Sequence, residues 1–230
     1  MKQEHIFFGV WFAFLVAMMG GRWLQLDTVV ADTLYRLQGN AWTLQNHVLT
    51  KDVIHEGGRR LSQAMGVFVV GALLASQIVP ALRSWRRPLL FLFLAVALST
   101  LTVSVIKQLV SMDCPWSLQR YGGTREFIGL LQRRPADYPD SACFPSGHAS
   151  AGYSWLALFF FFKATRPRWR WAGLFFALTL GLVFGFAQQL RGAHFLSHDL
   201  WTLVLCWSVS FTLAKLLLAN ETAGGEQTWR

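Results

Sequence analysis

Residues 143–150, with the sequence Cys-Phe-Pro-Ser-Gly-His-Ala-Ser, place a hydroxyl, a glycine and an imidazole just before an apolar run. Pro145 and Ser146 suit the start of a helix, because proline has the required backbone angle there and serine is a preferred N-cap. Gly147 lets an oxyanion approach the main chain closely, and the first N–H groups of a helix favour negative charge. His148 would then stand beside a bound phosphate. The stretch predicts a phosphate-binding corner, although taken alone it also suits a plain helix start.

A second polar cluster, residues 188–199, lies between two apolar runs and contains His194. Ionisable groups at such a boundary are costly and usually functional. An acidic residue about one helical turn after His194 would hold one ring nitrogen protonated and leave the other free to attack. The cluster therefore predicts a nucleophilic histidine with its orienting group. The alternative is a pair of interfacial histidines without chemistry.

The segment that follows the third apolar run, residues 107–148, is rich in groups that bind phosphate. Lys107 follows the third apolar run, where a lysine can also simply extend to the membrane interface. The loop beyond it carries glycine, tyrosine and arginine side chains, namely Arg120, Tyr121, Gly122, Gly123, Arg125, Arg133 and Arg134. It also carries acidic residues, namely Asp113, Glu126, Asp137 and Asp140. Structural ion pairs are therefore an alternative role for some of the arginines.

The composition indicates that membrane helices must position these residues. The chain is 53% hydrophobic and 14% charged, with a mean hydropathy of +0.36, which is unlike a soluble globule. A membrane span needs about 20 mainly apolar residues. Four stretches meet this readily and two are shorter or interrupted. In chain order the six are residues 6–24, 64–82, 88–106, 149–162, 172–190 and 200–219. A buried core helix is the alternative for 149–162 and 200–219.

We therefore predict an all-α, polytopic membrane protein, a six-transmembrane-helix bundle that forms a single domain over residues 1–230. Basic residues crowd two short turns, at 83–87 and at 163–170. Short basic loops stay in the cytoplasm, so both termini lie inside and the loop 107–148 faces outside. The basic residues of these turns then account for the net charge of +9. This charge also suits the anionic surface of a bilayer, which is the expected partner. Nucleic-acid binding is disfavoured because no soluble basic face with interleaved aromatics is present.

In a bacterium this orientation would place the loop in the periplasm, where disulfides persist. Cys114 and Cys143 flank the loop, and we favour a disulfide between them over two free thiols. Cys206 lies in the last span and is expected to pack as a small hydrophobe. The chain offers no tetrahedral set of Cys and His ligands, so no metal is predicted.

The segment after the first span has the spacing of an amphipathic helix, with Asp27 as its cap and an end before Gly39. Such a helix would lie on the membrane surface. The polar residues 40–60 that follow include His47 and His55. Neither has a nearby carboxylate or cysteine at a ligand spacing, so both are interpreted as surface residues.

Taken together, the three motifs resemble the type 2 phosphatidic acid phosphatase superfamily, which also contains vanadium haloperoxidases. That signature has a lysine with Arg-Pro seven residues later, a Pro-Ser-Gly-His, and an arginine followed by histidine and aspartate. Residues 145–148 match the middle motif in full, and Lys107, Pro115 and His194 occupy their expected places. The resemblance covers about the last two-thirds of the chain, and the six spans of the membrane members agree with the predicted bundle.

Two arginines of the signature are missing, because Cys114 and Gln188 stand where they are expected. Arg120, five residues past Pro115, is a candidate substitute for the first. Arg191, about one turn nearer to His194, is the obvious substitute for the second.

The acid of the third motif is also displaced, since His198 occupies its place and Asp199 follows. Either residue could contact His194. We favour Asp199 as the orienting group because a carboxylate stabilises the developing imidazolium.

The resemblance implies metal-independent hydrolysis of a lipid phosphate or pyrophosphate monoester at the outer membrane face, with no cofactor. His194 would form a phosphohistidine and His148 would protonate the leaving group. The equatorial phosphate oxygens would be held by Lys107, Arg120, Ser146, Gly147 and Arg191. Candidate substrates include phosphatidic acid, phosphatidylglycerophosphate, undecaprenyl pyrophosphate and the phosphate of lipid A. A lipid phosphotransferase and a non-catalytic protein that binds lipid phosphate are the alternatives.

Overall fold

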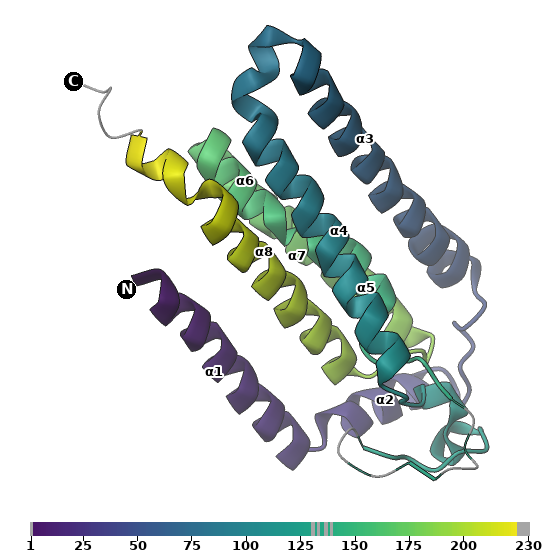
Figure 1. Ribbon diagram of the computed structural model, residues 1–230. Coiled ribbons are helices and arrows are strands. Elements are labelled where there is room, and N and C mark those ends of the chain that lie inside the picture. The colour runs from purple at the N-terminus through teal and green to yellow at the C-terminus, as the bar shows by residue number, and fades with distance from the viewer. Residues whose placement is uncertain (1, 130–131, 133, 136–137, 139, 225–230) are drawn as a thin grey trace.

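Long helices follow the apolar runs of the sequence, and a computed structural model describes them over residues 2–129, 132, 134, 135, 138 and 140–224 (Figure 1). The α-helices are α1 (Lys2–Trp23), α2 (Leu26–Leu37), α3 (Gly58–Ile78), α4 (Arg86–Leu109), α5 (Gly147–Tyr153), α6 (Ala157–Thr165), α7 (Arg170–Leu190) and α8 (Leu196–Gly224). A π-helical turn, η1 (Leu49–Gly57), leads into α3. Short 3₁₀ turns are η2 (Pro80–Trp85), η3 (Pro115–Ser117), η4 (Gln119–Tyr121), η5 (Ser154–Leu156) and η6 (Pro167–Trp169).

Five helical segments of the described chain are long and apolar enough to cross a membrane. They are Glu4–Trp23, Leu49–Ile78, Pro80–Leu109, Pro167–Leu190 and Leu196–Leu218. The predicted span 149–162 is not among them, because the continuous helical stretch α5–η5–α6 that contains it carries polar side chains, among them His148, Ser154 and Lys163, and is less apolar than the five. The predicted second span also ends earlier than residue 82, since Pro80 begins a new turn. The structure is thus all-α with five candidate membrane spans in the described chain, and the predicted sixth span is not confirmed.

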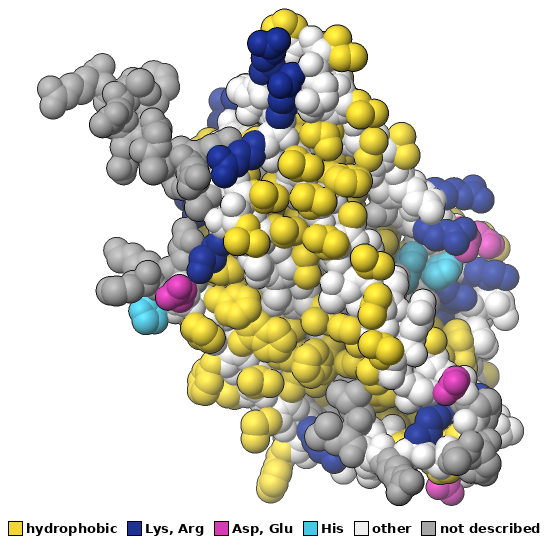
Figure 2. All heavy atoms as spheres, viewed as in Figure 1, with side chains coloured by type: hydrophobic (Ala, Val, Ile, Leu, Met, Phe, Trp, Pro, Cys, Tyr) yellow, Lys and Arg dark blue, Asp and Glu magenta, His cyan; other side chains and the backbone are white. Residues whose placement is uncertain are grey.

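The long helices run side by side, and α2 lies across one end of them (Figure 1). At the opposite end, η2 and η6 carry the basic turns 83–87 and 163–170. Figure 2 shows apolar side chains over the middle of the visible face and dark-blue Lys and Arg side chains at its top and margins. This is the pattern of a chain with an apolar belt between two polar ends. The chain enters the bundle from the α2 end at α3, α5 and α8, and this end gathers the candidate site.

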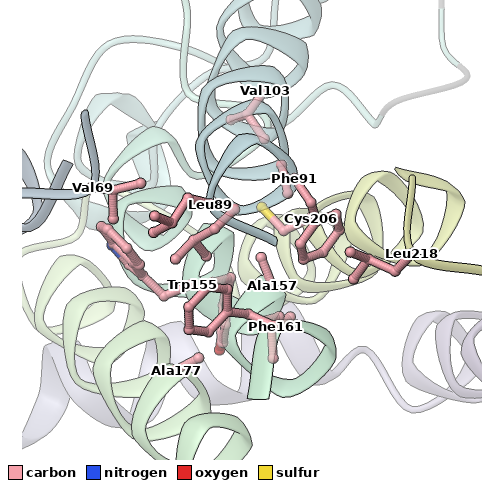
Figure 3. Packing of buried hydrophobic residues seen from close by; sticks show 14 of the residues in the cluster. Val69, Leu89, Phe91, Val103, Trp155, Ala157, Phe161, Ala177, Cys206 and Leu218 are labelled. Atoms are coloured by element: carbon pink, nitrogen blue, oxygen red, sulfur yellow. The ribbon is translucent and has the colours of Figure 1, made fainter. Parts of the chain in front are cut away.

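The core lies where α4, α6 and α8 meet, around Phe91, Trp155, Phe161 and Cys206 (Figure 3). Cys206 is a buried free thiol that packs among apolar side chains, as expected for a small hydrophobe. The segment from α5 to α6 packs against α7 along its length. The apolar run 149–162 is therefore buried inside the bundle, which explains its apolar character without a full-length lipid-facing helix.

Two glycines let α5 and α7 approach each other very closely. A Cβ added at Gly152 would lie 2.4 Å from the backbone nitrogen of Gly181, and one added at Gly181 would lie 2.1 Å from the Tyr153 ring. Real side chains would force the helices apart. Since α5 carries His148 and α7 leads to His194, this contact fixes the distance between the two halves of the candidate site.

The predicted amphipathic helix is confirmed as α2, but Asp27 does not cap it. The Asp27 carboxylate instead accepts a hydrogen bond of 2.8 Å from the backbone N–H of Ser197, in the first turn of α8. Carboxylates stabilise helix N-termini because these carry unpaired N–H groups. Burial raises the pKa of Asp27 above its usual range, despite this hydrogen bond. The contact ties α2 to the helix that carries His198 and Asp199.

Candidate active site

The motif residues meet at the α2 end of the bundle, although they come from three separate parts of the sequence. Lys107 is in the last turn of α4, and a Cβ built at Gly147 would lie 3.6 Å from its ammonium nitrogen. Ser146 precedes α5, and its backbone N–H donates to the His198 carbonyl across 3.3 Å. The Thr202 hydroxyl donates to the carbonyls of both Ser146 and His198, at 3.1 and 2.8 Å. These bonds fasten the start of α5 to the first turns of α8.

His194 is buried, and its Nδ1 donates to the backbone carbonyl of Cys143 across 2.6 Å. This contact keeps the proton on Nδ1 and the lone pair on Nε2, which is the nitrogen left to react. Burial is the main cause that holds the pKa of His194 well below its usual value, and the neighbouring His198 and Lys107 act in the same direction. His194 is therefore neutral near pH 7, as a nucleophile must be.

The two candidate orienting residues separate in the structure. His198 lies beside His194, with their Nδ1 atoms 3.4 Å apart. The Asp199 carboxylate instead accepts a hydrogen bond from the Gln189 amide and lies against Gly185, where a Cβ would be 2.7 Å from it. Adjacent residues on a helix point about 100° apart, so only one of the pair can face His194. Our preference for Asp199 as the contact of His194 does not match this geometry.

His148 lies in the first turn of α5 and is buried. It donates to the carbonyl of Ile54, and because its Nε2 has no partner among the described residues, the donor is Nδ1. Burial, followed by the proximity of His55, lowers the pKa of His148 from 6.5 to about 4. The Ser146 hydroxyl is buried beside the Asp199 carboxylate. Buried polar atoms are almost always satisfied, so the free Nε2 of His148 indicates a place for a polar ligand.

Arg191 follows α7 and is buried next to these histidines. Its guanidinium donates to the carbonyl of Gln45 across 2.8 Å and to the Gln188 side-chain oxygen across 3.2 Å. Burial lowers the pKa of Arg191, but a guanidinium stays protonated at any ordinary pH. The predicted substitute for the missing arginine therefore lies close enough for its charge to act on His148.

Arg120 takes another partner. Its guanidinium donates through two nitrogens to the carboxylate of Asp32 on α2, one of them at 2.7 Å. This bidentate pair raises the pKa of Arg120 and lowers that of Asp32. The predicted phosphate ligand thus anchors the loop to α2, because Asp32 offers it a planar acceptor.

The rest of the loop is held by a second ion cluster and by a cysteine bridge. The buried Asp113 carboxylate accepts hydrogen bonds from Arg125 and Arg134, and these lower its pKa despite burial. Cys114 and Cys143 form a disulfide, with Cα atoms 5.3 Å apart. Arg133 and Asp137 lie outside the described residues. The bridge matters to the site because the Cys143 carbonyl is the partner of His194.

His55 and Gln188 belong to the site, although the sequence did not single out either as a functional residue. The ring of His55 packs on that of His148, with centroids 4.2 Å apart, and its Nδ1 lies 2.9 Å from the Gln188 amide nitrogen. The only sequence signal was the position of Gln188, where an arginine was expected. No three His, Cys, Asp or Glu side chains of the described residues gather into a set that could hold a metal ion.

The sequence of this part of the chain matches a known family. The sequence model described as the PAP2 superfamily matches residues 88–221, from the start of α4 to the end of α8. Neither a search of curated proteins nor one of solved structures found a match to the chain. The matched segment contains Lys107, the Pro-Ser-Gly-His corner and His194, and it covers more than half of the 230 residues. The chain belongs to the PAP2 superfamily.

Proposed function

We propose that the protein hydrolyses the phosphate ester of a membrane lipid through a phosphohistidine on His194. Membership of the PAP2 superfamily suggests phosphatase-like activity. The observation that carries the proposal further is the hydrogen bond from His194 Nδ1 to the Cys143 carbonyl, which leaves Nε2 as a neutral nucleophile. The unpartnered Nε2 of His148 supplies a second group of the required kind nearby.

The reaction has two displacement steps. His194 Nε2 attacks phosphorus, a P–N bond forms, and the P–O bond to the lipid breaks. The departing oxygen takes a proton from Nε2 of protonated His148, because bound phosphate favours the charged form of that imidazole despite burial. His148 then takes a proton from water, which attacks phosphorus, breaks the P–N bond and releases inorganic phosphate. A proton transfer of this kind contributes typically about 10²–10⁴-fold in rate.

Charge on the phosphate oxygens needs cationic partners throughout both steps. Lys107 lies beside Gly147 and the charge of Arg191 acts on His148, so both cations are near the residues that would hold the phosphate. The Ser146 hydroxyl, beside the Asp199 carboxylate, is a further donor next to Gly147. Preorganised donors of this kind stabilise the charge that develops in the transition state.

His198 and the Cys143 carbonyl take the role of orienting His194 in this proposal. Asp199 then serves to fix α8 on α7 through Gln189. His198→Ala should consequently lower the turnover rate more than Asp199→Asn does. Equal thermal stability of the two variants would show that the difference concerns chemistry. The opposite order would return the orienting role to Asp199.

A lipid substrate agrees with a cleft beside the site. A cavity of about 610 Å³ opens between α1, α2 and the start of α8, and Phe144 and Trp201 line it. Phe144 also packs against His198, with ring centroids 5.4 Å apart. An apolar tail could occupy this cleft while its phosphate reaches the histidines.

The proposed topology places the site at the outer face. The basic turns 83–87 and 163–170 both lie at the opposite end of the bundle, which the positive-inside rule assigns to the cytoplasm. The segment α5–η5–α6 then returns from the outer to the inner side and acts as the sixth crossing inside the bundle. In a bacterium this is an inner-membrane protein whose site faces the periplasm.

The decisive experiment is phosphate release by the purified protein in detergent from a panel of lipid phosphates and pyrophosphates. We expect release from at least one lipid phosphate and background release by His194→Ala. Transfer of the phosphoryl group to an added alcohol in place of water would identify a phosphotransferase. Lipid phosphate binding without turnover of any substrate would contradict catalysis.

A further inference from the structure

The π-helical turn before α3 brings a third histidine to the site. His55 lies in η1, 93 residues before His148, and the two rings pack with centroids 4.2 Å apart and planes tilted by 36°. The His55 side chain is 30% exposed, whereas His148 is buried. His55 therefore covers the solvent side of His148. π-helical turns inside helices are rare and frequently occur at functional sites.

His148 packs against two rings and is held at one nitrogen. His55 covers one face, and Phe184 of α7 covers another part of the ring at a centroid distance of 4.9 Å. Gly58 makes room for Phe184, since a Cβ there would lie 2.4 Å from its ring. Nδ1 is held by the Ile54 carbonyl, so Nε2 alone stays available to a ligand.

A hydrogen-bond chain fixes His55 itself. Arg191 can only donate, so the Gln188 atom that it contacts is the oxygen, and the Gln188 nitrogen faces His55. His55 Nδ1 must accept from this nitrogen and carries its proton on Nε2. Gln188 occupies the position where the motif has an arginine. The glutamine thus links the cation Arg191 to the ring that packs on His148. An arginine at this position could not make the link, because it cannot accept a hydrogen bond from Arg191.

We propose that His55 is a positioning residue for the general acid, holding the His148 ring so that Nε2 faces the leaving-group oxygen. This inference rests on the proposed function, in which His148 protonates that oxygen. His55 itself neither touches the phosphate nor transfers a proton. Loss of its ring would let His148 rotate, and a misplacement of about 1 Å can cost about 100-fold in rate.

The test uses two phosphate monoesters of matched apolar size, one with an alkyl and one with an aryl leaving group. An alkoxide needs the acid, whereas an aryl oxide leaves largely without it. We expect His55→Ala to lower kcat about tenfold or more for the alkyl ester and by less than about threefold for the aryl ester. His55→Phe keeps a flat ring over His148 and should recover much of the alkyl activity. His47→Ala, an exposed histidine of the same segment, is the matched control and should leave both rates unchanged.

A double variant separates positioning from a general loss of structure. If His55 acts only through His148, then His55→Ala should add little to the loss caused by His148→Ala. Equal losses on both esters, or fully additive losses, would overturn the proposal. Failure of the proposed function looks different, because His194→Ala would then stay active or His148→Ala would show no dependence on the leaving group.

Discussion

A methyl group added at Gly152 tests whether the contact between α5 and α7 sets the geometry of the site. The Cβ of Gly152→Ala would lie 2.4 Å from the nitrogen and 2.5 Å from the Cα of Gly181, and 2.6 Å from the carbonyl carbon of Leu180. All three neighbours are backbone atoms, so no side chain can turn away. Ordinary contact begins at 3.4 Å, which exceeds the shortest of these distances by 1.0 Å. The two helices must therefore separate by about that amount.

The expected magnitude follows from where Gly152 lies. It is one helical turn beyond His148, whereas α7 leads directly to Arg191 and His194. Overpacking of this kind typically costs about 1–3 kcal/mol of stability. A displacement of about 1 Å between reacting groups can cost about 100-fold in rate. Gly152→Ala should therefore remain folded and yet lose about two orders of magnitude of kcat.

The assay combines kcat for a lipid phosphate with the thermal unfolding midpoint in the same detergent. Gly71→Ala in α3 is the matched control, because a Cβ there meets nothing within 4 Å. It should leave kcat unchanged. Wild-type kcat in Gly152→Ala, or an equal loss in Gly71→Ala, would refute the view that this helix contact positions the catalytic groups.

Three other measurements address the loop, the buried histidine and the topology. Mass spectrometry of non-reduced peptides should find Cys114 joined to Cys143, and Cys114→Ser should lower kcat by freeing the carbonyl that orients the nucleophile; two free thiols in the native protein would contradict this. Because the pKa of His148 falls from 6.5 to about 4 on folding, the unfolded chain binds its proton more readily, so stability drops as the pH falls from 7 to 5. The stability lost over this pH range through His148 is about 2 kcal/mol. The thermal midpoint of His148→Gln should therefore fall less than that of the wild-type protein, and an equal fall would contradict the lowered pKa of His148. Cysteines introduced at Thr124 and Thr165 should be labelled from opposite sides of the membrane, and labelling from one side would exclude the proposed topology.

Much of the fold was predictable because long apolar runs allow few structures. The runs that begin at residues 6, 88, 172 and 200 each correspond to a long helix. The run 149–162 is not confirmed as a span, since the helical stretch that contains it carries polar side chains and packs against α7. Composition reports whether side chains avoid water, and a buried core helix and a lipid-facing helix do so equally.

The candidate site was also predictable only in part. The positions of Lys107, His148 and His194 follow a pattern of residue types and spacings, and the structure places them at one end of the bundle. The partners of those residues depend on three-dimensional contacts that leave little trace in the sequence. His55 contacts His148 although 93 residues separate them, because the π-helical turn brings it there. Asp32 on α2 forms an ion pair with Arg120 of the loop.

The two candidate orienting residues show how the direction of a side chain on a helix separates sequence neighbours. His198 and Asp199 are neighbours in the sequence, and chemistry alone favours the carboxylate. The start of α8 turns His198 toward His194 and Asp199 toward Gln189. A backbone carbonyl, that of Cys143, completes the arrangement, and a carbonyl cannot be recognised from residue type.

The central claim is that His194 carries the phosphoryl group during turnover. The direct measurement is to mix the protein with a lipid phosphate, quench the reaction in base, where a P–N bond survives, and locate the phosphoryl group by peptide mass spectrometry. We expect it on His194 in the wild-type protein and in Gln188→Ala, and on no residue in His194→Ala. Continued phosphate release with no phosphoryl group on His194, or with the group on another residue, would contradict the account.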